Sequence, residues 1–565
     1  MSAEAQRSRG NRLLFLAACF LVAAVALSAR LVYWQIIRRE DYKLFQSGSG
    51  GVSAMALRGT SYDAPGHYLA VPSLLYDVGV SPRAITDTNQ VIEQLATILQ
   101  VEEATLREAL QETELEYVPL AQGLPASVGR RIKALDLFGV KLDLRPGRFY
   151  PEGRLAAAVL GFVNSTEQGY YGIEERYDMR LRGTEGFRIA SGPQVLFDLP
   201  LVQAPRNGAD LYLTIDRVVQ RAAEKHLQAA LSEYGADGGS IIVVDPRTGA
   251  IMAMAVAPTF DPNNLANITS FDIFVNSAIS CQYEPGSVFK IVTMATALDA
   301  GVVTRNERYW DAGKVEVGER VFQNWDRQAH GSTTMTEILA KSLNVGSIYV
   351  AQKLGPSRFY DGVRRFGFGE LTEVDLAGEV PGTVRQPGEP DWYPADLAAN
   401  SFGQGLAVTP LQMVMAVAAV ANKGVLMQPY VVSRIEQDGE VIWQATPQPR
   451  RRVMSREAAE ILVDMLVEAL PQETPLGVVP HYKSAGKTGT AQIFKNGRYD
   501  EEDIIASFAG FLPADEPRVV ALVKLDRPRR QAWGSRAAAP VWRDLATELC
   551  AYLGIPPDGM QLSGG

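Results

Sequence analysis

The feature that most constrains this chain is a single apolar stretch close to its N-terminus. Its side chains are apolar from Leu13 to Leu27, and the pattern resumes after Arg30. A helix over residues 13–37 would be roughly 37 Å long at ~1.5 Å per residue, which is enough to cross the ~30 Å hydrocarbon core of a bilayer. We therefore expect a transmembrane helix over residues 13–37, and no later segment is apolar enough to cross again.

The side chains beside this stretch predict its orientation. Arginines in the tail 1–12 favour a cytoplasmic start, while Tyr33 and Trp34 suit the opposite interface. The rest of the chain would then lie on the outer side of the membrane, held by one pass. The alternative is a cleaved signal peptide, because the unbroken apolar segment is short. Leu27 stands where cleavage requires a small residue, which favours retention of the anchor.

The remaining composition is that of a globular protein with more than one domain. A chain of 565 residues with 47% hydrophobic content is too long for one ordinary core. The net charge of −9 and the lack of a long basic run argue against nucleic acid as a partner. The cysteines and histidines have no metal-binding spacing, so we expect no cofactor. One disulfide between Cys281 and Cys550 stays open.

The pattern along the chain predicts two domains. Residues 71–206 mix short β-like runs with one amphipathic helical stretch at 89–112, and we expect the first domain to extend over residues 38–207. A strand followed by a helix at 217–231 then opens a second domain, which we expect to extend over residues 208–553. The tail 554–565, with two prolines and two final glycines, is expected to be disordered.

Strand signals lie at both ends of the second domain. Residues 240–244 and 250–256 are β-rich runs joined by a turn that contains Pro and Gly, and 507–512 and 518–525 are two further runs. Helical segments fill the region between them. This order predicts an α+β fold in which the two ends of the domain meet in one antiparallel sheet.

The first motif with chemical potential is Ser287-x-x-Lys290, which follows a Pro-Gly break. A serine in such a place is usually only a helix cap. Residues three apart on a helix share one face, however, so the Lys290 amine can reach the Ser287 hydroxyl. A buried, neutral lysine could take the hydroxyl proton and make the serine a nucleophile.

Two further motifs carry hydroxyl, amide and amine groups. Ser342 and Asn344 stand two residues apart before a helical stretch, and alone they indicate a loop or a cap. Residues 487–490, Lys-Thr-Gly-Thr, lie in β-like sequence and alone indicate a turn or a phosphate loop. The phosphate loop is excluded because its pattern requires a glycine where His481 stands.

Taken together and in this order, the three motifs match the Ser-x-x-Lys, Ser-x-Asn and Lys-Thr-Gly triplet of penicillin-binding proteins and class A β-lactamases. The chain also resembles the class B penicillin-binding proteins over most of its length. Ser61 and Ala64 depart from the isoleucine and arginine usual in that family, which leaves the local packing open. The segments that carry the resemblance are Arg58–Ala70, Arg148–Pro151, Gly161–Val163, Gly172–Gly183, Asn324–Trp325, Gly403–Gln412 and Ser507–Gly510.

The resemblance implies an architecture and a function. It implies an elongated mixed α/β pedestal, often called the dimerisation domain, over residues 38–207, and a penicillin-binding transpeptidase domain over residues 208–553. It further implies a bacterial peptidoglycan D,D-transpeptidase that cross-links stem peptides and is a target of β-lactams. Glu284 and the Gly403–Gln412 segment resemble division-type members more than elongation-type ones, which implies a septal role.

The same resemblance implies partners, because the chain has no polymerase domain of its own. Cross-linking requires nascent glycan, so the expected partners are a polytopic glycan polymerase of the shape, elongation, division and sporulation (SEDS) family and other division proteins. The expected location is the bacterial cytoplasmic membrane, with the catalytic domain on the extracytoplasmic side.

For the reacting groups, the resemblance implies Ser287 as nucleophile and Lys290 as its base. Ser342 would pass a proton to the leaving amine, with positive potential from Lys487. Asn344 would hydrogen-bond the substrate amide.

The third motif is implied to bind substrate. Thr488 and Thr490 would hold the terminal carboxylate, and Gly489 would let the strand approach the substrate closely. The backbone amides of Ser287 and Thr490 would form the oxyanion hole.

Three other functions remain open. A class A β-lactamase would require a Glu-x-x-Leu-Asn loop, and Glu379 stands at a plausible spacing without that pattern. A penicillin-sensing receptor would have more membrane helices or a signalling domain. A catalytically silent scaffold is disfavoured because all three motifs are intact.

Overall fold

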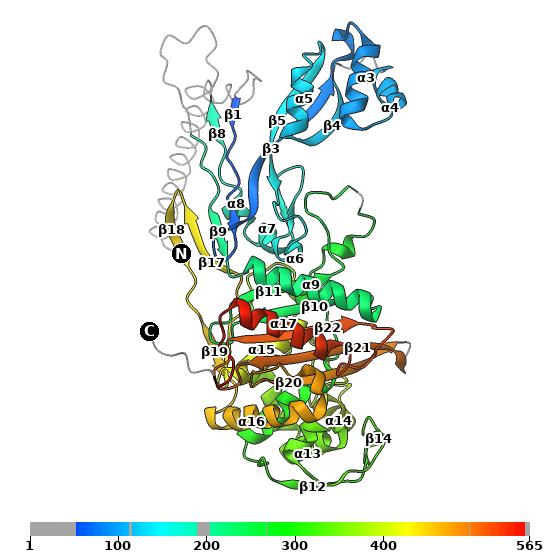
Figure 1. Cartoon of the computed structure of the whole chain (residues 1–565), viewed down its shortest axis with the longest axis vertical. Coiled ribbons are helices and arrows are strands. Elements are labelled where there is room, and N and C mark those ends of the chain that lie inside the picture. Colours follow the sequence, from blue (N-terminus) through cyan, green and yellow to red (C-terminus); the bar gives the residue numbers. More distant parts are fainter. Residues whose placement is uncertain (1–51, 112–115, 189–203, 267, 496–497, 560–565) are drawn as a thin grey trace, which may run out of the picture. The chain divides into compact units, whose positions relative to one another are not determined.

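The structure is a computed structural model that describes residues 52–559, except 112–115, 189–203, 267 and 496–497 (Figure 1). The chain divides into two units. The smaller one comprises the segments up to Ala56 and from Thr184 to Arg206, and it contains the antiparallel strands β1 (Val52–Ala54) and β8 (Gly186–Arg188). The larger unit, Leu57–Gly183 and Asn207 onward, contains the three motifs.

The predicted N-terminal anchor cannot be compared with the structure. Residues 1–12 and the transmembrane segment 13–37 lie outside the described residues. Within the described part of the chain, none of the helices combines the length and the apolar character that crossing a bilayer requires.

The C-terminal tail differs from its prediction. Disorder is expected from residue 554, but residues 554–559 are held against the domain. Ile555 is buried, and its carbonyl accepts a hydrogen bond from the Tyr482 hydroxyl at 3.0 Å. The amide of Asp558 donates to the carbonyl of His481 at 2.8 Å. Residues 554–559, which include Pro556 and Pro557, therefore pack against the domain. Residues 560–565 lie outside the described chain.

The two candidate disulfide partners do not pair. Cys281 and Cys550 are both free thiols, the first exposed and the second buried. Burial raises the pKa of Cys281, and it raises the pKa of Cys550 to about 11, so both thiols stay protonated at neutral pH.

A five-stranded antiparallel sheet forms the centre of the second domain, in the order β11, β10, β22, β21, β20 (Figure 1). The predicted hairpin supplies the first two strands and the C-terminal segments supply the others. The prediction that the two ends of the domain meet in one antiparallel sheet is confirmed. The strands are β10 (Gly238–Val244), β11 (Ile251–Ala257), β20 (Ala485–Lys495), β21 (Arg498–Leu512) and β22 (Val519–Asp526).

Alternate side chains of this sheet enter two different cores. In β10, Ile241 and Val243 pack with the apolar faces of α9 and α17, whereas Ile242 and Val244 belong to the core that contains α11 and α15. Burial on both faces explains why residues 241–244 of β10 are all apolar instead of alternating with polar residues. The four covering helices are α9 (Arg217–Tyr234), α11 (Lys290–Asp299), α15 (Pro410–Ala421) and α17 (Ala538–Tyr552).

Further helices and short strand pairs complete this domain. Helix α15 is buried along its whole length, and Thr409 and Gln412 cap its start reciprocally, so its apolar sequence reflects a core helix. The helices are α10 (Ser277–Ser280), α12 (Met335–Ala340), α13 (Asn344–Arg365), α14 (Pro394–Ser401) and α16 (Arg456–Glu473). The paired strands are β12 (Arg308–Asp311) with β15 (Gly331–Thr334), β13 (Lys314–Val317) with β14 (Arg320–Gln323), and β16 (Val425–Met427) with β19 (Pro449–Arg452).

A seven-stranded sheet joins the first domain to the second. Its order is β18, β17, β9, β2, β3, β4, and β5 also pairs with β3. The strand predicted to open the second domain, β9, therefore lies parallel to β2 of the first, and the amide of Thr60 donates to the carboxylate of Asp210 at 2.6 Å. The strands are β2 (Ser61–Tyr62), β3 (Tyr68–Val80), β4 (Val118–Pro125), β5 (Val140–Phe149), β9 (Asp210–Leu213), β17 (Val432–Gln437) and β18 (Glu440–Gln444).

The helical stretch predicted at 89–112 consists of two helices instead of one. Gln100 adopts a left-handed conformation (φ 56°) and ends the first helix, and Glu103 begins the second. A capping carboxylate, Asp87, starts the first helix by accepting from the amide of Gln90 at 3.0 Å. The helices of the first domain are α3 (Thr88–Leu99), α4 (Glu103–Gln111), α5 (Ala126–Ala134), α6 (Ala157–Leu160), α7 (Gly172–Arg176) and α8 (Asp178–Leu181), and β6 (Phe162–Val163) pairs with β7 (Gly169–Tyr170).

A buried ion network connects the segments that carry the resemblance in the first domain. Glu174 is fully buried and accepts from Arg58 and Arg148, each at 2.7 Å. Ser61, which replaces an isoleucine, lies in this network and accepts from Arg148 at 3.0 Å. Ala64, which replaces an arginine, is exposed. Both departures are therefore accommodated locally, one by a hydrogen bond and the other by solvent.

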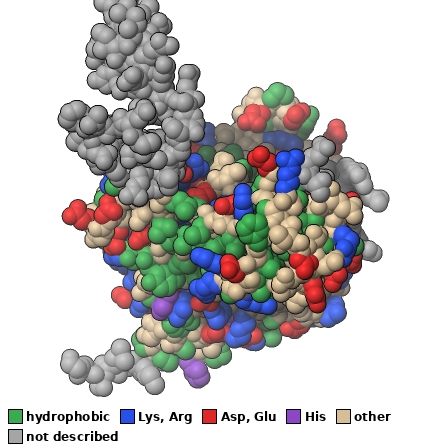
Figure 2. Space-filling view, turned by 90° about the horizontal axis from the view of Figure 1, so that it is seen from above, with side chains coloured by type: hydrophobic (Ala, Val, Ile, Leu, Met, Phe, Trp, Pro, Cys, Tyr) green, Lys and Arg blue, Asp and Glu red, His purple; other side chains and the backbone are tan. Residues whose placement is uncertain are grey.

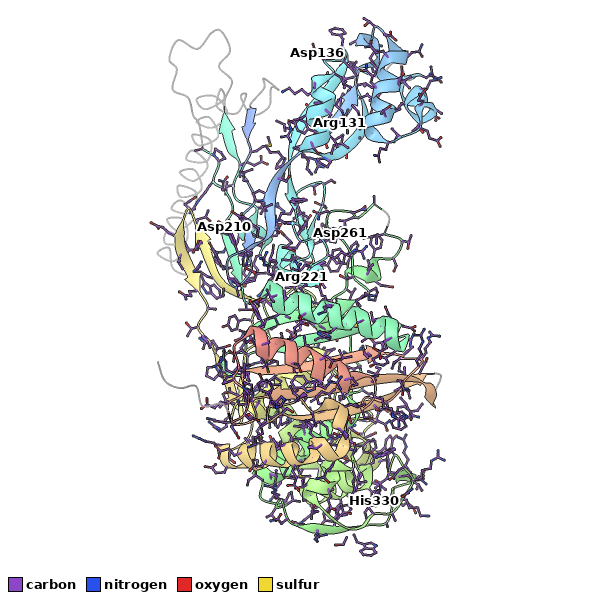
Figure 3. The ribbon with its side chains drawn as sticks, viewed as in Figure 1. Arg131, Asp136, Asp210, Arg221, Asp261 and His330 are labelled. Atoms are coloured by element: carbon purple, nitrogen blue, oxygen red, sulfur yellow. The ribbon has the colours of Figure 1, made fainter. Side chains whose placement is uncertain are left out.

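Charged side chains of both signs occur together on one face of the molecule. On the face shown in Figure 2, positive and negative side chains are interspersed. Two examples are labelled in Figure 3: Arg221 of α9 forms an ion pair with Glu152, and the His330 ring lies 2.8 Å from the carboxylate of Asp326. The Arg221 side chain is exposed, and an ion pair at the surface contributes little to stability, so the apolar cores hold the fold together.

Candidate active site

Ser287 lies on a tight turn that leads into helix α11. The turn is the 3-10 segment η4 (Gly286–Phe289), so the prediction that Ser287 opens a helix is correct in place but not in helix type. Gly286 has φ 56°, and its amide donates to the carbonyl of Gly403 at 3.0 Å. A Cβ added to Gly403 would lie 2.1 Å from the Gly286 carbonyl oxygen, so the Gly-Gln-Gly segment packs directly against the turn. Ser287 itself is only half-buried.

Lys290 is the first residue of α11, and only 1% of it is exposed. Its amine donates to the Ser342 carbonyl at 2.6 Å, to Oδ1 of Asn344 at 2.9 Å and to Oγ of Ser342 at 3.3 Å. In the described structure, the Lys290 amine contacts these three oxygens of residues 342 and 344 instead of the Ser287 hydroxyl. The structure thus brings the first and second motifs together.

The environment of the Lys290 amine favours its neutral form. Burial is the main cause that holds the pKa of Lys290 well below its usual value, and the positive charge of Lys487 acts in the same direction. Glu473 opposes both. A lysine in this state can accept a proton near neutral pH.

Ser342 bridges the amines of two lysines. It lies on the loop between α12 and α13 with φ 53°, a backbone conformation that is unusual for a residue other than glycine. Its Oγ accepts from Lys487 at 3.0 Å and from Lys290 at 3.3 Å. Asn344 begins α13, and its Nδ2 donates to the Gln323 carbonyl at 3.1 Å. The strained loop therefore aims its hydroxyl between the other two motifs.

Lys487 lies on β20 with no exposed surface. Besides Ser342, its amine contacts the carboxylate of Glu473 and the carbonyl of Thr488, the latter at 3.2 Å. Burial lowers the pKa of Lys487, and the charge and hydrogen bond of Glu473 oppose that effect. Glu473 ends α16 and its side chain is 6% exposed. It is absent from the residues predicted from sequence, because a single glutamate near a helix end has no distinguishing pattern.

The three substrate-binding candidates of the third motif lie in different environments. Thr488 is buried, and its hydroxyl contacts the carboxylate of Glu473. Thr490 is half-buried, and its Oγ1 accepts from the Gly534 amide at 3.1 Å. A Cβ on Gly489 would lie 2.9 Å from the Pro285 carbonyl oxygen, so this glycine lets the turn that carries Ser287 pack against β20.

Two tryptophans lie at the edge of this site. The Trp325 indole donates to the carbonyl of Lys341 at 2.9 Å, next to Ser342. Trp533 precedes Gly534, whose amide contacts Thr490. The two indole rings meet edge to face with centroids 5.5 Å apart, and both remain about half exposed. They connect the 342–344 loop with the β20 side of the site.

The acidic residues of the described chain are not gathered into a metal site. Within the described residues, no group of three or more histidine, cysteine, aspartate or glutamate side chains is gathered as a metal site. Glu379, the residue considered for a β-lactamase loop, accepts from the amides of Thr372 and Glu373 at 2.7 and 3.0 Å. These bonds stabilise its own loop.

Comparison with known proteins agrees with this geometry. Residues 239–547 match the penicillin binding protein transpeptidase domain, and residues 53–213 match the penicillin-binding protein dimerisation domain. The chain is 32% identical to stage V sporulation protein D of Bacillus subtilis, over 98% of this chain and 87% of that protein. It is 33% identical to penicillin-binding protein PbpB of Mycolicibacterium smegmatis, over 83% of this chain and 74% of that protein.

Solved structures agree as well. Penicillin binding protein 3 of Mycobacterium tuberculosis, in complex with aztreonam, has a TM-score of 0.70 and 28% identity, over 90% of this chain and 98% of that one. A peptidoglycan synthetase from Bifidobacterium adolescentis has a TM-score of 0.72 and 26% identity, over 91% of this chain and 98% of that one. With both domains matched and the three motifs in one site, the chain belongs to the class B penicillin-binding proteins, the monofunctional peptidoglycan D,D-transpeptidases.

Proposed function

We propose that this chain cross-links peptidoglycan stem peptides by a two-step acyl transfer in which Ser287 is the nucleophile. One observation carries the proposal: two buried lysines donate to the same Ser342 hydroxyl, beside a turn that presents the half-buried Ser287. An amine of lowered pKa next to a serine is the arrangement that activates a hydroxyl for attack.

In the first step, Lys290 accepts the proton of the Ser287 hydroxyl. The Ser287 oxygen then forms a bond to the carbonyl carbon of the penultimate D-alanine. The negative charge that develops on the carbonyl oxygen is bound by the backbone amides of Ser287 and Thr490. One donor of such a pair typically contributes roughly 3 kcal/mol to transition-state stabilisation.

The leaving group needs a proton when the peptide bond breaks. The Ser342 hydroxyl can deliver it, because it accepts from both Lys290 and Lys487 and so connects the base to the far side of the site. The terminal D-alanine departs with a protonated amine. In the second step, an amine from a neighbouring stem peptide forms a bond to the ester carbonyl carbon, and the bond from that carbon to the Ser287 oxygen breaks. The proton that the amine loses passes through Lys290 to the Ser287 oxygen.

Strand β20 is the edge of its sheet among the described strands, so an extended peptide can lie along it. Asn344 is assigned to the substrate amide, and Gly489 keeps the strand next to the Ser287 turn. Thr490 is the better placed of the two threonines for the terminal carboxylate, because it is only half-buried. Thr488 can take part only when its hydroxyl leaves Glu473.

We infer that β-lactams acylate Ser287 as well. The support is the similarity to penicillin binding protein 3 of Mycobacterium tuberculosis, which has been solved with aztreonam and with ampicillin. A β-lactamase activity is disfavoured, since Glu379 is engaged within its own loop and stands outside a Glu-x-x-Leu-Asn pattern.

The cellular setting is also a proposal. The apolar segment 13–37 anchors the chain in the bacterial cytoplasmic membrane, with the catalytic domain outside and the pedestal over residues 38–207 between them. Relatives include a protein named as an FtsI homologue and one named PbpB, which supports a division-type, septal role. A SEDS-family glycan polymerase is the expected partner. If the polymerase does not co-purify with the full-length protein from native membranes, that result would count against the proposed partnership.

The test of the catalytic assignment is covalent labelling. The purified full-length chain is incubated with a fluorescent penicillin, and peptide mass spectrometry locates the adduct. We expect the adduct on Ser287 and no labelling of the Ser287→Ala variant. The matched control is Ser347→Ala on α13, which changes a serine outside the three motifs. Labelling that survives in Ser287→Ala would overturn the assignment.

A further inference from the structure

Two buried lysines compete for one proton in this site. The amines of Lys290 and Lys487 both donate to Oγ of Ser342, at 3.3 and 3.0 Å. Both side chains are almost completely removed from water. Two ammonium groups that share one hydroxyl in a nearly dry site repel each other, so one of them must give up its proton well before the other.

The surroundings of the two amines differ in one respect. Among the described residues, the Lys290 amine contacts neutral oxygens alone, from Ser342 and Asn344. Lys487 contacts neutral oxygens of Ser342 and Thr488 and, in addition, the carboxylate of Glu473. Among the described residues, Glu473 is the one anionic group that either amine contacts.

We infer that Glu473 is a positioning residue that keeps the proton on Lys487 and thereby leaves Lys290 as the neutral base. The inference rests on the proposed function, in which Lys290 takes the Ser287 proton. Glu473 contacts Lys487 and Thr488 but none of the reacting atoms. Since its side chain is 6% exposed, its charge is poorly screened, and its removal would leave a buried ammonium group without a counterion.

This arrangement predicts a specific pH dependence. The charged groups that act on the two amines are Lys290 on α11, Lys487 on β20 and Glu473 on α16. The acylation rate should rise with pH as Lys290 loses its proton and fall at higher pH as Lys487 loses its own. Glu473 raises the pKa of both amines, but it contacts that of Lys487 and acts on Lys290 only through its charge. Replacing this carboxylate should therefore lower the pKa of Lys487 more and move the alkaline fall to lower pH.

The experiment compares acylation of the full-length chain by a fluorescent penicillin across pH. Glu473→Gln should lose roughly 10- to 100-fold in rate at neutral pH, and its alkaline limb should move down by about one pH unit or more. Glu473→Asp keeps the charge and should retain the position of the limb. The matched control, Glu468→Gln, changes a half-exposed glutamate of the same helix that pairs with Arg305. It should match the wild type.

Two outcomes overturn the inference: a Glu473→Gln variant with the wild-type profile, or one whose rate falls equally at every pH. If Glu473→Gln does not fold, ¹³C NMR of lysine-labelled wild-type protein replaces it, and Lys487 must then keep its proton to higher pH than Lys290. The reverse order contradicts the inference. If the wild type is not labelled at Ser287, the proposed acyl transfer itself is wrong. Failure of the proposed function can therefore be distinguished from failure of the inference about Glu473.

Discussion

Lys290 is the residue whose role depends most on its protonation state. Burial and the charge of Lys487 hold its pKa well below the usual value, so a lysine is neutral here where an arginine would stay charged. We predict that Lys290→Arg lowers the rate of acylation by penicillin by roughly 10²- to 10⁴-fold, the range that a general base contributes. The reaction is quenched at set times after mixing, and the labelled protein is quantified by its fluorescence in a gel.

The control for this substitution is Lys353→Arg, which changes an exposed lysine of α13 paired with Glu307. It should acylate at the wild-type rate. An unchanged rate in Lys290→Arg, with thermal unfolding as in the wild type, would show that another group activates Ser287.

Glu284, three residues before Ser287, should make stability depend on pH. Burial raises its pKa from the ordinary 4.5 to about 7, although hydrogen bonds from Gly405 and Tyr499 oppose the rise. A raised carboxyl pKa means that the folded state binds the proton more tightly. The stability that this proton contributes is present below pH 4.5 and is lost as the pH rises through about 7.

We therefore predict that Glu284→Gln raises the free energy of unfolding by about 1–3 kcal/mol at alkaline pH, relative to the wild type, and has a smaller effect in acid. Urea unfolding at the two pH values measures the difference. Glu370→Gln, a more exposed glutamate that pairs with Arg451, is the control. Equal effects at both pH values would contradict the shifted pKa.

At this scale, the sequence motifs identified residues that lie together in space but not the electrostatics of the place where they meet. The three motifs come together at Ser342, although they are far apart in sequence. Glu473 could not be predicted, because its importance arises only where the end of α16 meets β20. The preference of Lys290 for the 342–344 loop over Ser287 also depends on packing between helices.

Among the structural elements, α7 contains the residue on which the ion network of the first domain depends. Glu174 is the shared acceptor of Arg58 and Arg148, and all three are buried. We predict that Glu174→Gln lowers the free energy of unfolding by about 3–5 kcal/mol, because the buried Arg148 loses its counterion and Arg58 is left with Asp178 alone. Urea unfolding of the full-length chain measures this loss.

Glu175→Gln on the same helix is the matched control, since that side chain is exposed and accepts only from the amide of Tyr171. It should change stability by less than about 0.5 kcal/mol. A similar effect of both substitutions would show that the network contributes no more than a surface pair.

Local sequence patterns predicted the helices and strands correctly where the apolar residues recur in a regular pattern. The apolar runs of β10 and β11 and the helix α9 lie where they were predicted. The stretch 89–112 was predicted as one helix because its apolar spacing continues across the break at Gln100, whose left-handed backbone has no sequence signal. The pairing of β9 with β2 is a long-range contact that no local pattern encodes.

At the scale of the whole molecule, strands and hydrogen bonds cross the boundary that the sequence predicts between the two domains. The seven-stranded sheet contains strands from both, and the Tyr177 hydroxyl donates to Asp375 at 3.0 Å, which in turn accepts from the amide of Val432 at 2.8 Å. The match to the dimerisation domain likewise ends at residue 213, beyond the predicted end at 207. A change in the sequence pattern marks where a domain is expected to end, whereas a β-sheet can include strands from both sides of that boundary.

The lifetime of the acyl-enzyme tests the central claim most directly, because a transpeptidase and a β-lactamase both acylate the serine and differ in the fate of the ester. Glu379 is held by Thr372 and Glu373, so no carboxylate is assigned to activate water on the ester. The wild-type chain is labelled with fluorescent penicillin, excess drug is removed, and the labelled band is followed over time. We predict that the label persists for many minutes, whereas an enzyme that hydrolyses at ~10 per second would clear it at once. Loss of the label within seconds, with hydrolysed penicillin accumulating over many turnovers, would contradict the transpeptidase account.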